Sequence, residues 1–322
     1  DVYALGLLLF VPRLRARRSL FFAAGLAGPM FFYPLYRAWL SGLGDLVIGA
    51  LPVVMATLFG AGVLVAHRAG RQQAADCTVG SQALKGIWDA PTRRAIYDAF
   101  ARSGKPYAED AFKSVSTAFD GYVARWTSMR TDACRATRVR GEQSEELFDL
   151  RMQCLDGRLK EVAALSALLR DADAPLVENS VRAAYQLAPI EDCADAPRIL
   201  ARVRPLRDAS QRAEVAALRG KQAEVAALLR AGRYAEGAPA AEALLESTRR
   251  LGYLPLVGDA LLLLASFEVR RGHFAAAESN FNAALWTAVA AGDEAQAFAA
   301  SSEMIRLHVD QGHFAPAESS VR

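Results

Sequence analysis

Four cysteines are the residues of this sequence with the most definite chemistry. Cys77, Cys134, Cys154 and Cys193 all fall in one part of the 322-residue chain. An even number of cysteines can form disulfides, and four of them allow three pairings. A second interpretation is free buried cysteines, because the thiol side chain packs as a small hydrophobe. Zinc is disfavoured, since no Cys-x-x-Cys pair and no nearby pair of histidines completes a ligand set.

No catalytic arrangement accompanies the cysteines. His273 and His313 occupy matching positions after glycine in a repeated motif, which favours a structural role at a turn, and His308 is isolated. The chain has no glycine-rich phosphate loop and none of the motifs VAIK, HRD and DFG, so it cannot transfer phosphate by itself. We expect no catalytic residue, no metal site and no cofactor site in this chain. The remaining clustered carboxylates are typical of helix starts or solvated faces: Glu145, Glu146, Glu191 and Asp192.

The charge balance excludes one class of partner. Lysine and arginine total 38 against 35 acidic residues, a net charge of +3, so no strong basic field favours nucleic acid. Four cysteines in 322 residues also exclude a small scaffold held together by many disulfides.

Residues 19–66 predict one or two transmembrane helices. Leu46 to Ala66 is an unbroken run of uncharged residues, long enough for a bilayer core of about 30 Å. A buried core helix is the alternative. Ser19 to Tyr36 is a shorter apolar run that either crosses and returns as a helical hairpin or lies in the membrane interface. Arginines at 13–18 place that end in the cytoplasm, so one crossing puts residues 67–322 outside it and two crossings bring them back.

Amphipathic helices are predicted to follow the apolar region. Asp89 and Pro91 suit the start of a helix that runs to about Ser103 and stops at Gly104. From Pro106 a longer helix carries apolar residues at spacings of three and four: Phe112, Val115, Phe119, Tyr122, Trp126, Met129 and Ala133.

The next helix is predicted from Glu145 to Arg170, with Ser144 as its cap. It repeats the same apolar spacing at Leu155, Leu159, Val162, Ser166 and Leu169. We therefore predict an antiparallel hairpin of two long helices, in which Trp88 and Trp126 are packing residues. A symmetric hairpin turning near Gly141 would leave Cys134 and Cys154 out of register by roughly 10 Å.

The last third of the chain contains an internal repeat. The glycine of a Gly-x-aromatic motif recurs at 232, 272 and 312, a period of about 40 residues. Such a period is typical of helix-pair solenoids of the tetratricopeptide type, whose usual unit is about 34 residues. One helix is predicted from Val257 to Arg270 and its partner from Phe274 to Ala290. Small residues should let the helices approach and large ones fill between layers: Ala276, Ala277, Ala283 and Ala284, with Phe274, Phe281, Leu285 and Trp286.

The expected fold class is therefore all-α, with a membrane helix or helical hairpin, a long-helix hairpin domain and a tetratricopeptide-like α-solenoid. The expected domains are 1–18, 19–66, 67–207 and 208–322. Because the repeat stops inside a helix, we expect the sequence to be a piece of a longer protein.

Five motifs in the middle region carry a family resemblance. In order they are WD at 88–89, YA at 107–108, DACRATRVRGEQS at 132–144, DLRMQCL at 149–155 and DCAD at 192–195. Together they resemble the region after the membrane helix of myxobacterial-type serine/threonine protein kinases with C-terminal tetratricopeptide repeats, and the match runs from Cys77 to the end. The opening DVYALG, with Asp1 and Gly6, resembles the Asp-x-Tyr-x-x-Gly signature of the kinase C-lobe, where the aspartate braces the catalytic loop.

The resemblance implies a location and a set of partners. In that family the kinase is cytoplasmic and one helix crosses, which implies that residues 67–322 lie on the outer side of the bacterial inner membrane. Disulfides persist there, so two bridges among the four cysteines are favoured. ATP and Mg²⁺ would bind only to a kinase domain before Asp1.

Two hypotheses for function follow. The first is a non-catalytic, membrane-anchored sensor and interaction region of such a kinase, with a protein or peptide on the solenoid and possible self-association. The second is a multi-span membrane scaffold whose helical region is cytoplasmic and which has no kinase.

Overall fold

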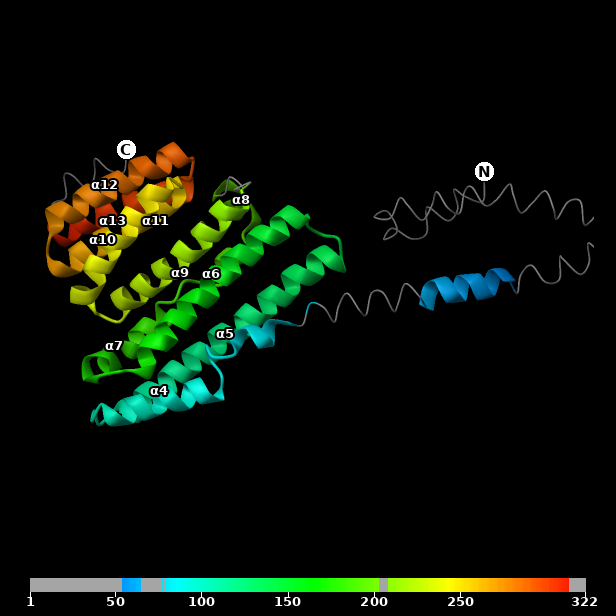
Figure 1. Ribbon diagram of the computed structural model, residues 1–322, viewed down its shortest axis with the longest axis horizontal. Helices are drawn as coiled ribbons and strands as arrows, with labels where there is room; N and C mark the ends of the chain where they lie inside the picture. Colours follow the sequence, from blue (N-terminus) through cyan, green and yellow to red (C-terminus); the bar gives the residue numbers. More distant parts are fainter. Residues whose placement is uncertain (1–53, 65–76, 78, 203–207, 313–322) are drawn as a thin grey trace, which may run out of the picture. The chain divides into compact units, whose positions relative to one another are not determined.

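The described part of the chain is entirely helical in its regular structure. The structure, a computed structural model, describes residues 54–64, 77, 79–202 and 208–312 (Figure 1). No strand occurs within those ranges, which confirms the all-α prediction for them. Residues 77–137 and 143–322 group into one compact unit, and residues 54–64 belong to another.

The predicted membrane segments lie mostly outside the described ranges. Ser19 to Tyr36 is wholly outside them, and of Leu46 to Ala66 only residues 54–64 are described, as helix with exposed apolar side chains. In the ranges that the structure covers, no helix combines the length and the apolar character that a bilayer crossing requires.

The compact unit opens with a short 3-10 helix, η2 (Val79–Leu84), and helix α4 (Ala90–Arg102). The side chain of Asp89 caps α4 by accepting hydrogen bonds from the backbone N–H and the hydroxyl of Thr92. Gly104 ends this segment in the left-handed region, with φ +71°. The predicted start and end of the helix are confirmed.

Helices α5 (Ala108–Arg138) and α6 (Glu145–Arg170) form the predicted hairpin, and Figure 1 shows them side by side. Ser144 caps α6, as expected. The indole N–H of Trp126 on α5 donates to the carbonyl of Leu155 on α6 at 2.7 Å. The seam of α5 lies in the core, with Val115, Phe119, Tyr122, Trp126 and Ala133 buried and Phe112 and Met129 partly so. Trp88 and Trp126 are packing residues, as predicted.

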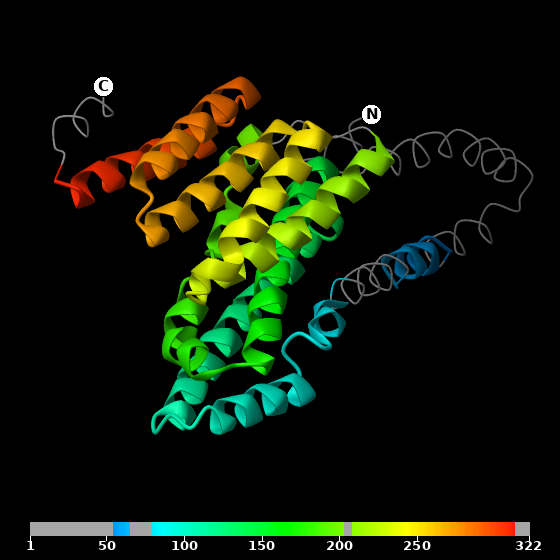
Figure 2. The same ribbon diagram turned by 60° about the vertical axis from the view of Figure 1, so that its left-hand side comes forward.

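Four elements lead from the hairpin to the repeats. They are α7 (Ala174–Tyr185), the 3-10 turn η3 (Glu191–Ala194), α8 (Ala196–Arg202) and α9 (Ala209–Arg230). Helix α9 runs along α6, which both views of the ribbon show (Figures 1 and 2). Its alanines Ala223 and Ala227 join the core of the hairpin, while Val225 joins the core of the repeats. One helix therefore belongs to both cores, and residues on both sides of the expected boundary at 207/208 fall in one compact unit.

Within the described residues, the repeats are an antiparallel array of four further helices. These are α10 (Tyr234–Leu251), α11 (Leu254–Arg271), α12 (Phe274–Ala291) and α13 (Glu294–Asp310). A left-handed glycine stands at each junction, at 232, 252, 272, 292 and 312. After α11 the N–H of Gly272 bonds to Val269 and that of His273 to Glu268, the Schellman pattern that only a residue tolerating positive φ permits at low cost. The period of the sequence motif therefore contains two equal steps from glycine to glycine, and this half-period step was not predicted.

Several packing predictions in the repeats were wrong. Phe274 and Trp286 were expected to fill between layers, yet they are 43% and 68% exposed. Ala276 is exposed as well, whereas Ala277, Ala284 and Phe281 are buried as expected. Helix α12 is apolar around most of its surface, so periodicity could not indicate which face would be covered. Helix α11 begins at Leu254, before the predicted Val257, with Pro255 in its first turn.

A candidate binding groove between α6, α9 and α11

One feature of the unit that suits a ligand is a half-open groove with a cavity volume of about 260 Å³. Its walls come from α6, α9, the η3–α8 segment and the N-terminal ends of α11 and α13. Its lining residues are Leu150, Gln153, Cys154, Gly157, Arg158, Glu161, Asp192, Ile199, Arg219, Gln222, Ala223, Ala226, Arg230, Tyr253, Pro255, Asp259 and Asp293.

Helical periodicity explains how α6 and α9 supply two walls. The α9 residues at 219, 222, 223, 226 and 230 follow one face of that helix, and those of α6 at 153, 154, 157, 158 and 161 follow another. Gly157, Ala223 and Ala226 have little or no side chain on these faces, so space remains between the two backbones. The groove therefore results from small residues at helical spacing.

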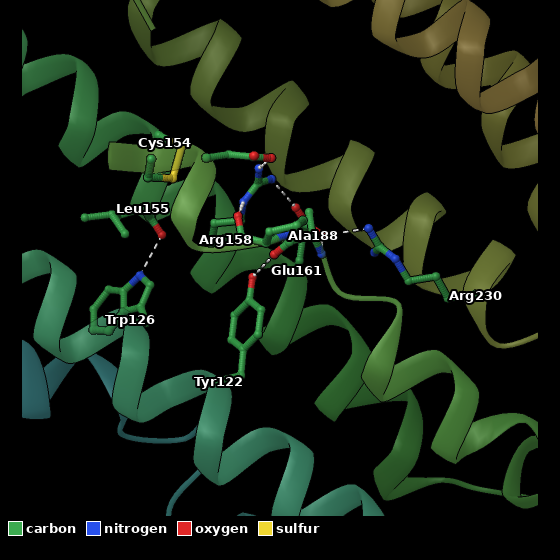
Figure 3. A network of polar contacts seen from close by, with 11 residues as sticks. Tyr122, Trp126, Cys154, Leu155, Arg158, Glu161, Ala188 and Arg230 are labelled. Carbon is green, nitrogen blue, oxygen red and sulfur yellow. Dashed lines mark hydrogen bonds and ion pairs between the residues drawn. A yellow bond between two sulfur atoms is a disulfide. The ribbon is translucent and has the colours of Figure 1, made fainter. Parts of the chain in front are cut away.

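An ion-pair network joins the two walls (Figure 3). Glu161 on α6 accepts from Arg158 one turn earlier at 3.0 Å and from Arg230 on α9 at 2.6 Å. The three side chains are only 13–17% exposed. Because one carboxylate is shared by two mostly buried guanidinium groups, removing it would take from Arg230 its ion-pair partner in the groove and would leave Arg158 with Asp192 alone.

The segment between α7 and η3 is attached to this network (Figure 3). The guanidinium of Arg158 also donates to the carbonyl of Pro189 at 3.0 Å and pairs with Asp192 at 3.4 Å. The hydroxyl of Tyr122 on α5 donates to the carbonyl of Ala188 at 2.8 Å. Burial above all, and then the negative charge of Glu161, raises the pKa of Tyr122 well above its ordinary value, so the hydroxyl remains a donor.

Arg219 also lines the groove, but it does not belong to this network of ion pairs. In the part of the chain that the structure describes, it forms no ion pair, unlike Arg158 and Arg230. It lies near Tyr253, where burial raises the pKa of the phenol and the charge of Arg219 acts in the opposite direction. A ligand group that meets Arg219 would not have to displace an existing partner among the described residues.

The far end of the groove is built from the starts of α11 and α13. Asp293 caps α13 by accepting from the backbone N–H of Gln296 at 2.9 Å. The side chain of Gln296 crosses to α11 and donates to Pro255 and to Asp259 at 2.9 and 2.7 Å. The Gln296 side chain fits because Gly258 has no side chain. A Cβ on Gly258 would lie 2.0 Å from Oε1 of Gln296.

The four cysteines form two disulfides, Cys77–Cys134 and Cys154–Cys193, each with a Cα–Cα separation of 5.6 Å. Two bridges were favoured from the resemblance, whereas the pairing had been left open. The first ties the segment before η2 to α5. The second ties α6 to η3, and Cys154 lines the groove.

Other residues singled out in the sequence have structural roles or lie outside the described ranges. Asp1, Gly6 and His313 are outside them. His273 stands at the α11–α12 turn, with its Nδ1 2.6 Å from Glu268, and does not cap α12. Glu145 and Glu146 are in the first turn of α6, and Glu191 and Asp192 in that of η3. No metal-ligand cluster occurs among the residues that were placed.

Apart from Cys154 and Asp192, the groove residues were not singled out by sequence reasoning. Arg158, Arg230 and Tyr253 come from distant positions and share no motif. One signal was available: Arg158 and Glu161 are charged residues one turn apart that flank the apolar seam, next to Leu159 and Val162.

No family model, no curated protein and no solved structure matches this chain.

Proposed function

We propose that this chain is a non-catalytic, membrane-anchored sensor and interaction region of a bacterial serine/threonine protein kinase, and that its groove holds a peptide segment of a protein partner. The observation that carries the binding role is the groove between α6, α9 and α11, with mixed polar and apolar walls. Drug-sized ligands usually occupy about 300–1,000 Å³, so a cavity of about 260 Å³ suits a short stretch of peptide better than a large cofactor.

The groove is ordered before a partner arrives. The Arg158–Glu161–Arg230 network connects the α6 and α9 walls, and the bonds to Ala188 and Pro189 fix the segment that leads into η3. A binding site that is already rigid loses less conformational entropy on association. Arg219 and Gln222 on α9 then offer donors to a peptide.

The membrane and kinase context rests on the sequence. The apolar run of Leu46 to Ala66 supports a helical anchor in the lipid bilayer of the bacterial inner membrane. Disulfides persist in oxidising compartments, so the two bridges support a location of residues 67–322 outside the cytoplasm. The five motifs and DVYALG support the kinase. In this proposal, partner binding or self-association of the outer region biases the arrangement of kinase domains on the other side of the membrane.

Photo-crosslinking from within the groove tests the binding role. A photoreactive amino acid replaces Gln222 in the full chain in its native membranes, and the matched control replaces Glu224, which is exposed on α9 outside the groove. We expect a discrete protein adduct from position 222 and none from position 224. Equal adducts from both positions, or none from either, would contradict a groove-bound partner.

The upstream gene sequence tests the kinase context. HRD followed by DFG before Asp1 would support it. Further apolar spans without those motifs would favour the multi-span scaffold.

A further inference from the structure

The two disulfides differ in how far they are covered. Cys77, Cys134 and Cys193 are 6%, 8% and 0% exposed, whereas Cys154 is partly exposed and forms part of the groove wall. Exchange requires a thiolate to reach a sulfur of the disulfide. A small thiol can therefore approach the Cys154–Cys193 bridge through the groove, whereas both cysteines of the Cys77–Cys134 bridge are buried.

The surroundings of Cys193 favour its departure in such an exchange. The buried guanidinium of Arg151 donates from Nε to the backbone carbonyl of Cys193 at 3.2 Å and also pairs with Asp132 at 3.8 Å, so a partly balanced positive charge lies at the backbone of Cys193. A neighbouring cation stabilises a thiolate, and a more stable thiolate leaves faster. The carboxylate of Asp192, the preceding residue, pairs with Arg158.

We infer that Cys154–Cys193 is a thiol–disulfide exchange site that takes a dithiol through the groove. One thiolate of the dithiol attacks Sγ of Cys154, the bond between the two sulfurs breaks, and Cys193 leaves as a thiolate. The second thiolate of the dithiol then attacks the mixed disulfide and releases Cys154. The dithiol is oxidised to its disulfide and the two cysteines are reduced.

Exchange at this position alters a wall of the groove. The bridge is the covalent link between α6 and η3, and Asp192 and Ile199 of the η3–α8 segment line the cavity. After reduction, η3 is held by polar contacts such as Arg158 to Asp192 and Arg151 to Cys193. The exchange itself is independent of the proposed function, whereas an effect of reduction on a bound peptide rests on it.

Timed reduction of the full chain tests the inference. The protein is treated with dithiothreitol well below its thermal unfolding midpoint, quenched with iodoacetamide at intervals and analysed as peptides by mass spectrometry. We expect Cys154 and Cys193 to become alkylated about tenfold faster than Cys77 and Cys134, because only their bridge is reached from the groove. Equal rates, or faster loss of Cys77–Cys134, would overturn the inference.

Two glycine variants test the route of access. Gly157 lines the groove one turn from Cys154, and a Cβ on it would meet no atom within 4 Å. Gly157→Leu should therefore add a side chain to the groove and slow reduction of Cys154–Cys193 severalfold. Gly220→Leu is the control, on α9 outside the groove, also with open space around it.

Unchanged reduction in Gly157→Leu, or equal slowing in Gly220→Leu, would show that the groove is not the route. Neither result depends on a partner protein, so a failure here is distinct from a failure of the crosslinking experiment.

Discussion

Single carboxylates hold several junctions of this fold, and Asp89 is the clearest case. It accepts from the backbone N–H of Gly86 at 2.7 Å as well as from Thr92, and so fixes the turn after η2 against the start of α4. These bonds, that of Gly86 foremost, lower the pKa of Asp89 from 3.8 to about 2.

The lowered pKa predicts a pH effect. A group whose pKa is depressed by folding contributes stability above its unfolded value and loses that contribution as the pH falls through the folded value. We expect the urea midpoint to fall between about pH 4 and pH 2 partly because Asp89 becomes protonated. Asp89→Asn keeps a capping acceptor without the charge and should flatten this portion of the profile. An unaltered profile in the variant would contradict the assignment.

Glu161 is the most consequential charge in the groove because it balances two guanidinium groups. Glu161→Gln should lower the free energy of unfolding by about 3 kcal/mol, since Arg230 would stay mostly buried without its carboxylate and Arg158 would keep only Asp192. Equilibrium urea unfolding measures the change.

The matched control for that substitution is Glu109→Gln. Its ion pair with Lys113 is about two-thirds exposed on both sides, so its loss should change stability much less than the loss of Glu161 does. Similar effects of both substitutions would mean that burial of the groove network contributes nothing to the loss of stability in Glu161→Gln.

At the scale of helices, local signals predicted more than periodicity did. Asp89, Ser144 and Gly104 mark the ends of elements by their own backbone preferences, and those ends were predicted correctly. The left-handed turns at Gly252 and Gly292 were not predicted because these glycines are followed by Tyr-Leu and Asp-Glu and so lack the Gly-x-aromatic motif. The exposure of Trp286 was not predicted because the sequence of a helix that is apolar on most sides does not indicate which face is buried.

The close approach of α10 and α11 depends on a missing side chain. A Cβ on Gly237 would lie 2.2 Å from the ring of Phe267, which is fully buried. Gly237→Ala should therefore destabilise the protein by about 1–3 kcal/mol through overpacking, although alanine favours helix. Thermal unfolding measures this.

Gly220→Ala is the comparison for that variant. This glycine is inside α9 with open space around it, so alanine should stabilise the protein by about 0.5–1 kcal/mol. Stabilisation by both substitutions would show that Phe267 can move away.

At the scale of the whole molecule, the all-α class followed from the sequence but the groove did not. Its lining combines residues from several elements, and which of their faces meet is decided by the packing of α9 on α6 and of α11 on α9. No spacing within one helix contains that information. The disulfide pairing was open for the same reason, since four cysteines allow three pairings on sequence alone.

The sidedness of the proposed membrane anchor has its own test. If residues 67–322 lie outside the cytoplasm, Cys154 and Cys193 in spheroplasts should react with a membrane-impermeant maleimide only after an impermeant reductant is added. Labelling without reductant, and only after lysis, would favour the two-span cytoplasmic arrangement.

The evenly spaced left-handed glycines of the repeats set a rule for how such an array can change in length. Each step from one of these glycines to the next reverses the direction of the chain. One step added or removed would therefore exchange the N- and C-terminal ends of every helix after it, whereas two steps restore the direction and the order of the faces. Insertions and deletions that preserve the array should accordingly come in whole periods of the sequence motif, from one Gly-x-aromatic glycine to the next, and never in half periods.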